Sequence, residues 1–154
     1  MVKIMFVCHG NICRSPMAEF IFRNMIKEKC LSDKFYISSS ATSREEIGNY
    51  VHHGTKRKLC EVGISCEEKT AVQLTKKDYE TNDYILCMES YNVKNTLRIV
   101  GEDKEGKVHR LLDFSTRPRD IADPWYTGNF DETYNDIVEG CEAFLDYIFK
   151  NSLI

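Results

Sequence analysis

Short apolar runs alternate with longer segments of helical periodicity along this chain. Lys3–Cys8 is an almost continuous apolar run, which is typical of a strand buried on both faces of a parallel sheet. Between Met17 and Ile26 apolar residues recur at near-helical spacing, and Pro16 stands where a first helical turn would begin. The two segments predict a strand, a tight polar loop and a helix in direct succession.

The same alternation continues to the end of the chain. It predicts further strands at 35–38, 83–88 and 108–112, helices at 55–61, 90–100 and 130–149, and a short helix or turn at 71–79. The last helix has the clearest apolar face, made of Ile137, Cys141, Phe144, Leu145 and Ile148. Before it, Asp113 to Asn129 contains two prolines and a glycine and is predicted to be a long loop.

Strands that alternate with helices predict a three-layer α/β domain built on a parallel sheet. No linker or repeat divides the sequence, so we expect one domain over residues 1–154. Ligands of such sheets bind at the carboxyl ends of the strands. The loop that starts at Cys8 is therefore the first candidate for a functional site.

Composition narrows the class of protein. With 42% hydrophobic and 29% charged residues, the chain is an ordinary globular sequence. Its apolar runs are far shorter than the roughly 20 residues that cross a bilayer, and the N-terminus lacks the pattern of a secretory signal, so we expect a cytoplasmic location. The net charge of −3 gives no electrostatic reason to expect nucleic acid or a membrane as a partner.

Cysteine usage excludes two further classes. The seven cysteines are an odd number and form no C-x2-C pair, which argues against a secreted disulfide framework and against a structural zinc site. We expect reduced thiols, most of them in the core, and no bound metal. The adjacent pair His52-His53 is interpreted as exposed loop residues, because neighbouring side chains point in different directions.

The candidate loop has the composition of an oxyanion site. Five residues separate Cys8 from Arg14, and their amide groups can form a nest for a tetrahedral anion. Gly10 permits a close backbone approach, Arg14 adds a planar fork for two oxygens, and the following helix directs its positive end at the same point. A Cys and an Arg at this spacing also occur by chance, but the strand before and the helix after favour a phosphate site with a Cys8 thiolate.

The segment Cys8–Glu19 resembles the signature of the low-molecular-weight protein tyrosine phosphatases. Asp123–Tyr126 resembles the segment that carries the general acid of that family, and Asp83–Met88 resembles one of its core strands. The resemblance covers essentially the whole chain. It implies a flavodoxin-like, four-stranded parallel sheet flanked by helices, and no cofactor. It also implies hydrolysis of phosphotyrosine and aryl phosphate monoesters through a phosphocysteine, with phosphotyrosine-containing proteins or peptides as partners and inorganic phosphate as product.

The resemblance also assigns roles to single residues. Cys8 matches the nucleophile, Arg14 the phosphate-binding arginine and Asp123 the general acid, for which Asp120 is a weaker alternative. The remaining phosphate-binding positions are those of the loop itself: His9, Gly10, Asn11, Ile12, Cys13 and Ser15.

Further positions would support the loop or line the substrate pocket. Asn11 matches a residue that keeps the loop in shape, with Ser39 as its expected partner, and Ser15 matches one that hydrogen-bonds the nucleophile's sulfur. Cys13 matches a cysteine that forms a reversible disulfide with the nucleophile, although simple loop packing explains it equally well. Candidates for an aromatic wall are Tyr50, Trp125 and Tyr126.

Some features leave the substrate open. His9 stands where the family more usually has an apolar residue, and Glu45 and Glu46 lie in the variable loop. Arg117 and Arg119 are candidates for attracting acidic substrate sequences.

Two alternative activities share the expected fold. An arsenate reductase would relay a disulfide through cysteines such as Cys60, Cys66 or Cys87. A protein arginine phosphatase is the other alternative, although Ile12 in the loop favours an aryl phosphate.

Overall fold

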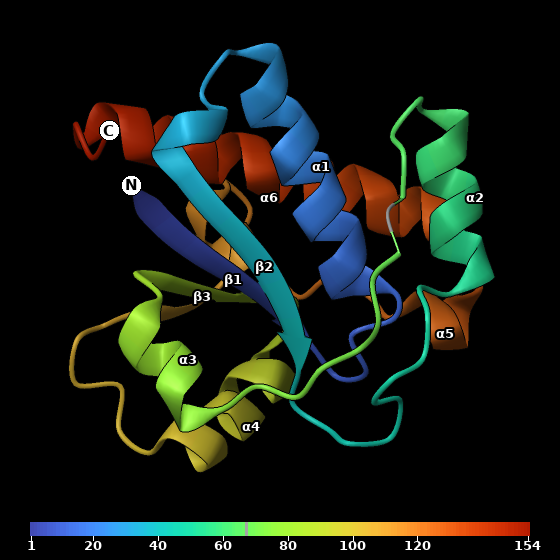
Figure 1. Cartoon of the computed structure of the whole chain (residues 1–154), viewed down its shortest axis with the longest axis horizontal. Coiled ribbons are helices and arrows are strands. Elements are labelled where there is room, and N and C mark those ends of the chain that lie inside the picture. Colours follow the sequence, from blue (N-terminus) through green and yellow to red (C-terminus); the bar gives the residue numbers. More distant parts are fainter. Residues whose placement is uncertain (67) are drawn as a thin grey trace.

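The structure is a computed structural model of the chain and describes residues 1–66 and 68–154. Its centre is a parallel sheet with the strand order β2-β1-β3-β4 (Figure 1). The strands are β1 Val2–Cys8, β2 Phe35–Ala41, β3 Tyr84–Cys87 and β4 Val108–Arg110. This arrangement confirms the expected three-layer, flavodoxin-like α/β fold with four parallel strands.

Helices cover both faces of the sheet. They are α1 Arg14–Glu28, α2 His53–Glu61, α3 Lys76–Thr81, α4 Ser90–Val100, α5 Pro124–Thr127 and α6 Phe130–Lys150, with short 3-10 turns at Ser32–Lys34 and Leu111–Phe114. In Figure 1, α1 and α6 lie on one face and α3 and α4 on the other.

Several predicted boundaries need correction. The strand predicted at 108–112 ends at Arg110, where the 3-10 turn Leu111–Phe114 begins. Strand β2 extends to Ala41, because its polar end pairs in register with the end of β1. The segment 71–79, predicted to be a helix or a turn, is helical only from Lys76, after a Thr75–Asp78 capping box. The residues before Lys76 pair with the end of β2: Leu74 N donates to Ala41 O. The segment 113–129 is not all loop, since it contains α5, whose N-cap is Asp123.

Strand β1 is apolar on both faces because both are covered. Ile4 and Phe6 belong to the larger hydrophobic cluster, with α1 and α6, whereas Met5 and Val7 belong to a second cluster with side chains around α3 and α4. This alternation is the reason that the strand reads as a continuous apolar run.

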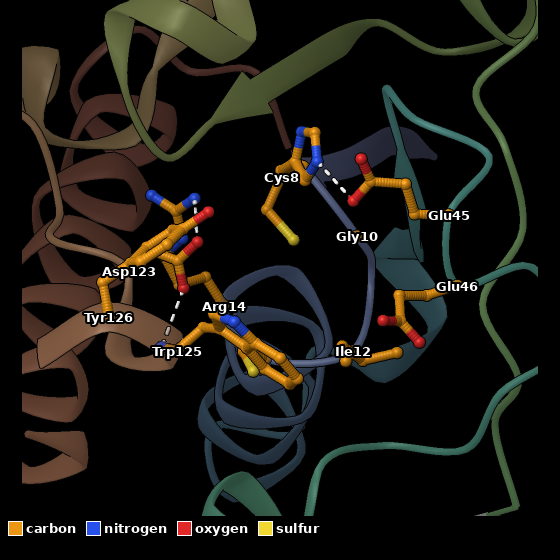
Figure 2. A pocket seen from close by; sticks show the side chains of 11 residues that line it. Cys8, Gly10, Ile12, Arg14, Glu45, Glu46, Asp123, Trp125 and Tyr126 are labelled. Carbon is orange, nitrogen blue, oxygen red and sulfur yellow. Dashed lines mark hydrogen bonds and ion pairs between the residues drawn. The ribbon is translucent and has the colours of Figure 1, made fainter. Parts of the chain in front are cut away.

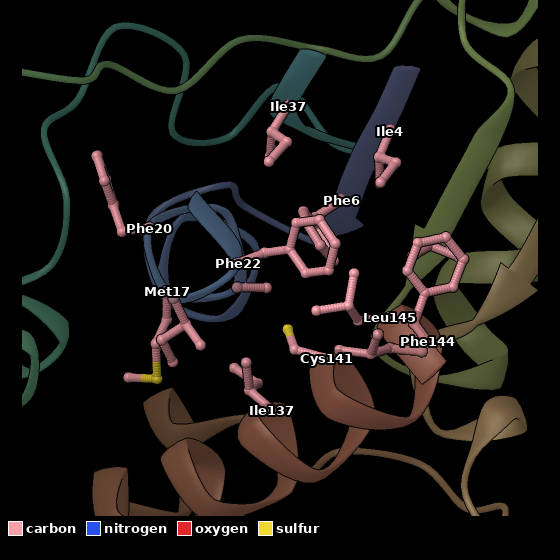
Figure 3. Close-up of a cluster of buried hydrophobic side chains, with 14 of the residues drawn as sticks. Ile4, Phe6, Met17, Phe20, Phe22, Ile37, Ile137, Cys141, Phe144 and Leu145 are labelled. Atoms are coloured by element: carbon pink, nitrogen blue, oxygen red, sulfur yellow. The ribbon is translucent and has the colours of Figure 1, made fainter. Parts of the chain in front are cut away.

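The larger cluster joins the sheet to α1 and α6 (Figure 3). Phe22 of α1 lies at its middle, with ring centroids 6.0 Å from Phe6, 5.4 Å from Phe35 and 5.9 Å from Phe144. The predicted apolar face of α6 is confirmed, since all five of its residues are buried. This packing fixes α1, and therefore the end of α1 that starts at Arg14.

The strand order decides where chain segments meet. Strand β1 lies between β2 and β3, and the segments that leave the carboxyl ends of β1 and β3 emerge side by side. This is the switch point at which α/β sheets bind ligands. It brings Cys8 and the residues that follow Cys87 to one edge of the sheet.

Gly140 of α6 allows a close contact that a larger residue would prevent. A Cβ atom at this position would lie 2.5 Å from Cγ of the buried Leu111. We predict that Gly140→Ala lowers the free energy of unfolding by about 1–2 kcal/mol, because overpacking outweighs the gain of about 1 kcal/mol in helix propensity. Urea denaturation measures the change. The exposed Glu142→Ala on the same helix serves as control, and an unchanged or higher stability for Gly140→Ala would contradict the packing.

Candidate active site

A cavity opens at the carboxyl end of β1 (Figure 2). Its lining comes from three segments that are far apart in the sequence: Cys8, His9, Gly10, Ile12, Cys13 and Arg14, then Glu45 and Glu46, then Asp123, Trp125 and Tyr126. Tyr50 is not part of this lining. It is exposed, its ring lies 5.8 Å from the Lys56 ammonium, and its backbone pairs with Thr70. The aromatic part of the wall is therefore Trp125 and Tyr126.

The loop after β1 turns its carbonyl groups outward. The carbonyls of Cys8 and His9 accept hydrogen bonds from Thr42 N and Ser43 N, both at 3.0 Å. The Ile12 carbonyl accepts from His52 N at 2.8 Å.

These outward carbonyls determine where the loop amides point. In a trans peptide the N–H points opposite to the C=O, and the described residues contain no cis peptide. The amides of His9, Gly10 and Cys13 are therefore directed toward the interior of the loop. The loop has the inward N–H groups that an oxyanion requires.

Asn11 holds the loop in its shape. Its φ of 59° is in the left-handed region, which asparagine tolerates better than most residues. Its Nδ2 donates to Ser15 Oγ at 2.7 Å and to Ser39 Oγ at 3.0 Å, and its Oδ1 accepts from Val72 N at 3.2 Å. The structure thus brings Asn11, Ser15 and Ser39 together behind the cavity.

The sulfur of Cys8 lies at the centre of these contacts. Asn11 N donates to it at 3.2 Å, and Ser15 Oγ lies 3.0 Å away. Because Ser15 Oγ already accepts from Asn11, its own proton is available for the sulfur. Its other acceptor, Ser40 O, is more distant at 3.4 Å. Two hydrogen-bond donors are therefore directed at this one sulfur.

Arg14 crosses the base of the cavity and is almost fully buried. Its Nη1 bonds to Glu89 and donates to Ile121 O at 2.8 Å, while its Nη2 lies 3.3 Å from Asp123 Oδ2. Within the described residues, these bonds use three of the five guanidinium N–H donors and leave two for an oxyanion. Burial disfavours the cation, but the negative charges of Cys8, Glu89 and Asp123 outweigh it and raise the pKa of Arg14.

Asp123 faces the same cavity from the opposite wall. It caps α5 by accepting from Trp125 N at 3.0 Å, and its other oxygen contacts Arg14. Pro124, at the first position of α5, fixes the backbone that follows. This short helix holds the carboxyl group at the mouth and leaves it partly accessible.

The second cysteine of the loop differs sharply from the first. Burial raises the pKa of Cys13 to about 12, and the negative charges of Cys8 and Asp123 add to this effect. Cys13 is therefore a neutral thiol beside the cavity. Cys8, Cys13, Cys87 and Cys141 are buried, whereas Cys30 and Cys60 are exposed.

The rim opposite Asp123 is acidic. His9 Nε2 lies 2.9 Å from Glu45 Oε2, and Glu46 accepts from Asn49 Nδ2 at 2.5 Å. A Cβ atom on Gly10 would lie 3.4 Å from Glu46 Cγ, so the Glu46 side chain packs against the loop. Figure 2 shows Glu45 and Glu46 across the cavity from Trp125.

Arg119 is not directed at the cavity. It pairs with Asp136 at 2.8 Å and with Glu139 at 2.9 Å, both on α6. Hydrogen bonds from Arg119 and Ser115 lower the pKa of Glu139 to about 2. The arginine therefore anchors the segment before Asp123 to α6, and the expectation that it attracts acidic substrates does not fit its contacts.

Two acidic residues near the site were not predicted from the sequence. Glu89 lies two residues after the end of β3, and only the strand order places it beside Arg14. Glu19 is buried on α1, where it accepts from Ser39 Oγ at 2.5 Å and pairs with Arg23 at 2.7 Å. A single carboxylate inside an apolar helical face was a visible sign that it needs a partner.

Lys69 approaches the same buried carboxylate. Its Nζ lies 3.9 Å from Glu19 Oε1 and donates to Ser39 O at 3.3 Å. Burial lowers the pKa of Lys69, and the Glu19 charge opposes that shift. Residues 1–66 and 68–154 contain no group of three or more His, Cys, Asp or Glu side chains arranged to bind a metal ion, and none of their helices has the length and apolarity to span a membrane.

Comparison with known proteins gives consistent matches over the length of the chain. The model of a family described as low molecular weight phosphotyrosine protein phosphatase matches residues 3–153. The low molecular weight protein-tyrosine-phosphatase YfkJ of Bacillus subtilis is 40% identical over 152 residues, which cover 97% of each chain. The enzyme PtpA of Staphylococcus epidermidis is 35% identical over 153 residues, which cover 99% of this chain and 97% of PtpA.

A solved structure agrees with these matches. The crystal structure of YfkJ from Bacillus subtilis superposes with a TM-score of 0.94 at 39% identity, covering 98% of this chain and 96% of the other.

Asn11 offers a test of the loop geometry that does not depend on activity. Asn11→Gly keeps the left-handed backbone but loses the side-chain hydrogen bonds, whereas Asn11→Ala loses both. We predict that both variants are less stable than the wild type, and that the alanine variant is the less stable by about 1 kcal/mol. Urea denaturation of the three proteins checks the order. Equal stability of the two variants would show that the backbone at residue 11 is unstrained.

Proposed function

The chain belongs to the low molecular weight phosphotyrosine protein phosphatase family and is a protein-tyrosine phosphatase that acts through a phosphocysteine intermediate; we propose that Cys8, Arg14 and Asp123 carry out its chemistry. Cys8 is the nucleophile, Arg14 with the loop amides binds the phosphoryl oxygens, and Asp123 is the general acid. The observation that carries this proposal is the convergence of all three on one cavity, with inward-facing amides around the sulfur.

The first step transfers the phosphoryl group to sulfur. The Cys8 thiolate forms an S–P bond in line with the bond to the tyrosine oxygen, which breaks. Asp123 in its neutral form gives its proton to the departing phenolate. Arg14 and the amides stabilise the charge on the three equatorial oxygens.

The second step restores the enzyme. Asp123, now a carboxylate, takes a proton from water while the water oxygen forms a new P–O bond. The S–P bond breaks, the electron pair returns to sulfur, and inorganic phosphate leaves. Ser15 supports this step, because its hydrogen bond stabilises the Cys8 thiolate as leaving group.

Asp120 is a poorer candidate for the acid than Asp123. It accepts from Ser90 N at 2.8 Å and from Arg110 Nη1 at 3.0 Å. Burial acts to raise its pKa, but these hydrogen bonds outweigh burial and lower the pKa of Asp120. A carboxyl group held in its charged form has no proton to give, and Asp120 does not line the cavity.

The wall favours an aryl phosphate. Trp125 and Tyr126 present aromatic rings at the mouth, and Ile12 adds an apolar contact nearer the base. An arsenate reductase would need a cysteine to relay a disulfide. Cys87 is fully buried in the cluster on the other face of the sheet, and burial raises its pKa to about 12, so it does not suit that role.

Substitution of the nucleophile and the acid tests the mechanism. We predict that Cys8→Ser abolishes turnover of p-nitrophenyl phosphate. Asp123→Asn should slow phenyl phosphate hydrolysis by roughly 10²–10⁴-fold, and p-nitrophenyl phosphate much less, because a good leaving group needs little protonation. Steady-state kinetics over a series of aryl phosphates measures both effects.

The matched control for Asp123→Asn is Asp120→Asn, which should keep turnover near the wild-type rate. Equal losses across leaving groups for Asp123→Asn would remove Asp123 from the acid role. Turnover by Cys8→Ser at the wild-type rate would show that Cys8 is not the nucleophile.

The substrates are phosphoproteins, and the acidic rim suggests which phosphotyrosine sites fit best. Glu45 and Glu46 lie where the residues that flank a bound phosphotyrosine would pass. Apart from Arg14, which the phosphate would engage, the lining contains carboxylates and His9 but no Lys or other Arg. We propose that the enzyme prefers phosphotyrosines flanked by lysine or arginine.

Peptides with reversed flanks test this preference. We predict that kcat/KM at low salt is about threefold to tenfold higher for lysine-flanked than for glutamate-flanked phosphotyrosine peptides, as expected for partly screened charges. The double substitution Glu45→Gln, Glu46→Gln should remove most of the difference without changing p-nitrophenyl phosphate turnover. A preference that persists in the double variant would assign it to other residues.

A further inference from the structure

We infer that the side chain of His52 is a positioning residue that holds Trp125, and with it the carboxyl group of Asp123, against the loop around Cys8. The inference rests on the proposed role of Asp123 as general acid. His52 touches neither the sulfur nor the phosphate position, so it acts only through its neighbours.

The backbone of His52 is fixed to the catalytic loop. Its N–H donates to Ile12 O at 2.8 Å, next to Cys13. Its side chain also caps α2, because Nδ1 accepts from Gly54 N at 3.0 Å. The imidazole therefore starts from a fixed point on the loop and has a defined orientation.

The ring of His52 lies in an aromatic cluster that reaches the acid segment. It stacks on Phe130, at 5.4 Å between centroids and 17° between planes, and on His53 at 4.2 Å and 27°. It meets Trp125 edge-on, at 5.6 Å and 75°. His52 thus joins the catalytic loop, the start of α6 and the start of α5.

Phe130 gives the cluster a rigid backing. A Cβ atom on Gly54 would lie 2.3 Å from Cζ of Phe130, so the absence of a side chain at residue 54 is what admits the Phe130 ring. The ring is held between Gly54 and His52, and its position limits how far His52 can tilt. A tilt of His52 would move its contact with Trp125.

Trp125 transmits this position to the acid. The backbone N–H of Trp125 donates to Asp123 Oδ1 at 3.0 Å, and one residue, Pro124, separates the two in the chain. The indole is otherwise more than half exposed, with 57% of its surface accessible. An edge contact from a fixed ring is therefore a substantial restraint on the indole and on the carboxyl group behind it.

The cap requires the neutral form of His52, in which Nδ1 is an acceptor and the proton is on Nε2. Burial and the charge of His53 lower the pKa of His52, while Asp123 and Glu46, which face it from the other segments, oppose that shift. Because the pKa of His52 in the fold is below the ordinary value of about 6.5, the ring is still neutral at pH 6.5 and is protonated only as the pH falls through that lower pKa. The restraint is therefore complete at pH 6.5 and above, and it is lost as the pH falls through the lowered pKa.

Two substitutions of His52 distinguish its role as the cap of α2 from the role of its aromatic ring. His52→Asn keeps an acceptor for Gly54 N but removes the ring, whereas His52→Phe keeps a ring but removes the acceptor. Arg57→Gln, at an exposed position on α2 outside this aromatic cluster, is the matched control. Each variant is assayed with phenyl phosphate and p-nitrophenyl phosphate from pH 5 to 8, beside Asp123→Asn.

Loss of the ring should resemble a partial loss of the acid. We expect His52→Asn to lower kcat for phenyl phosphate about 5–20-fold and for p-nitrophenyl phosphate less than about threefold, a fraction of the full general-acid contribution. His52→Phe should keep the leaving-group dependence of the wild type and lose the part of the acid-side pH dependence that comes from His52. Arg57→Gln should match the wild type.

A uniform loss across leaving groups in His52→Asn, or no loss, would overturn the inference. If His52→Asn fails to fold, a leaving-group defect in His52→Phe as large as that of Asp123→Asn would overturn it as well, because a ring at residue 52 should suffice. If Asp123→Asn shows no leaving-group dependence, the acid assignment fails, and this inference fails with it. A normal Asp123→Asn result beside a uniform His52→Asn defect overturns only the role of His52.

Discussion

The buried carboxylate of Glu19 determines the direction of the hydrogen bonds that end at the nucleophile. A carboxylate only accepts, so Ser39 must donate to Glu19 and can then only accept from Asn11. The amide of Asn11 consequently directs its second proton to Ser15, whose own proton is left for Cys8. One fixed charge on α1 thus specifies a donor, and not an acceptor, beside the sulfur.

The shape of the loop requires backbone strain at Asn11, and the free energy of this strain is smaller than that of the hydrogen bonds that Asn11 makes. A left-handed residue costs about 1–2 kcal/mol, whereas each buried hydrogen bond contributes about 0.5–1.5 kcal/mol. Asn11 makes three side-chain bonds, to Ser15, Ser39 and Val72, and its backbone N–H is turned to Cys8. The same residue therefore holds the loop open and supplies one of the inward-facing amides.

Much of this site could be predicted from the sequence, and the limits have physical causes. Cys8 and Arg14 are close in sequence, so the strand–loop–helix pattern alone brings them together. Glu89 became visible only with the strand order, because pairing between β1 and β3 is not encoded in local periodicity. The sequence predicts only a loop after Asp113, because α5 is a single turn and is too short to show a helical repeat.

Aromatic contacts were the least predictable part of the site. Tyr50 was expected at the wall from its sequence neighbourhood, yet side-chain direction in an irregular loop has no period to reveal it. His52 was interpreted as an exposed loop residue for the same reason. It is instead the N-cap of α2 and stacks on Phe130, a residue 78 positions later in the chain.

Arg14 joins the loop that carries the nucleophile to the segment that carries Asp123, and these two parts of the site are anchored by different elements of the fold. The nucleophile and its loop are fixed by β1, α1 and the network behind Asn11. The segment that carries Asp123 is anchored by the ion pair between Arg119 and Glu139 of α6 and by the hydrogen bond from Ile121 N to Met88 O. Asp123 itself is held only by the one-turn helix α5 that it caps and by its contact with Arg14. The guanidinium contacts Glu89 after β3 as well as Ile121 and Asp123 in that segment. The group proposed to bind the phosphate is therefore also the link that sets the distance between sulfur and acid, and an oxyanion that engages its two remaining donors would tighten that link as it binds.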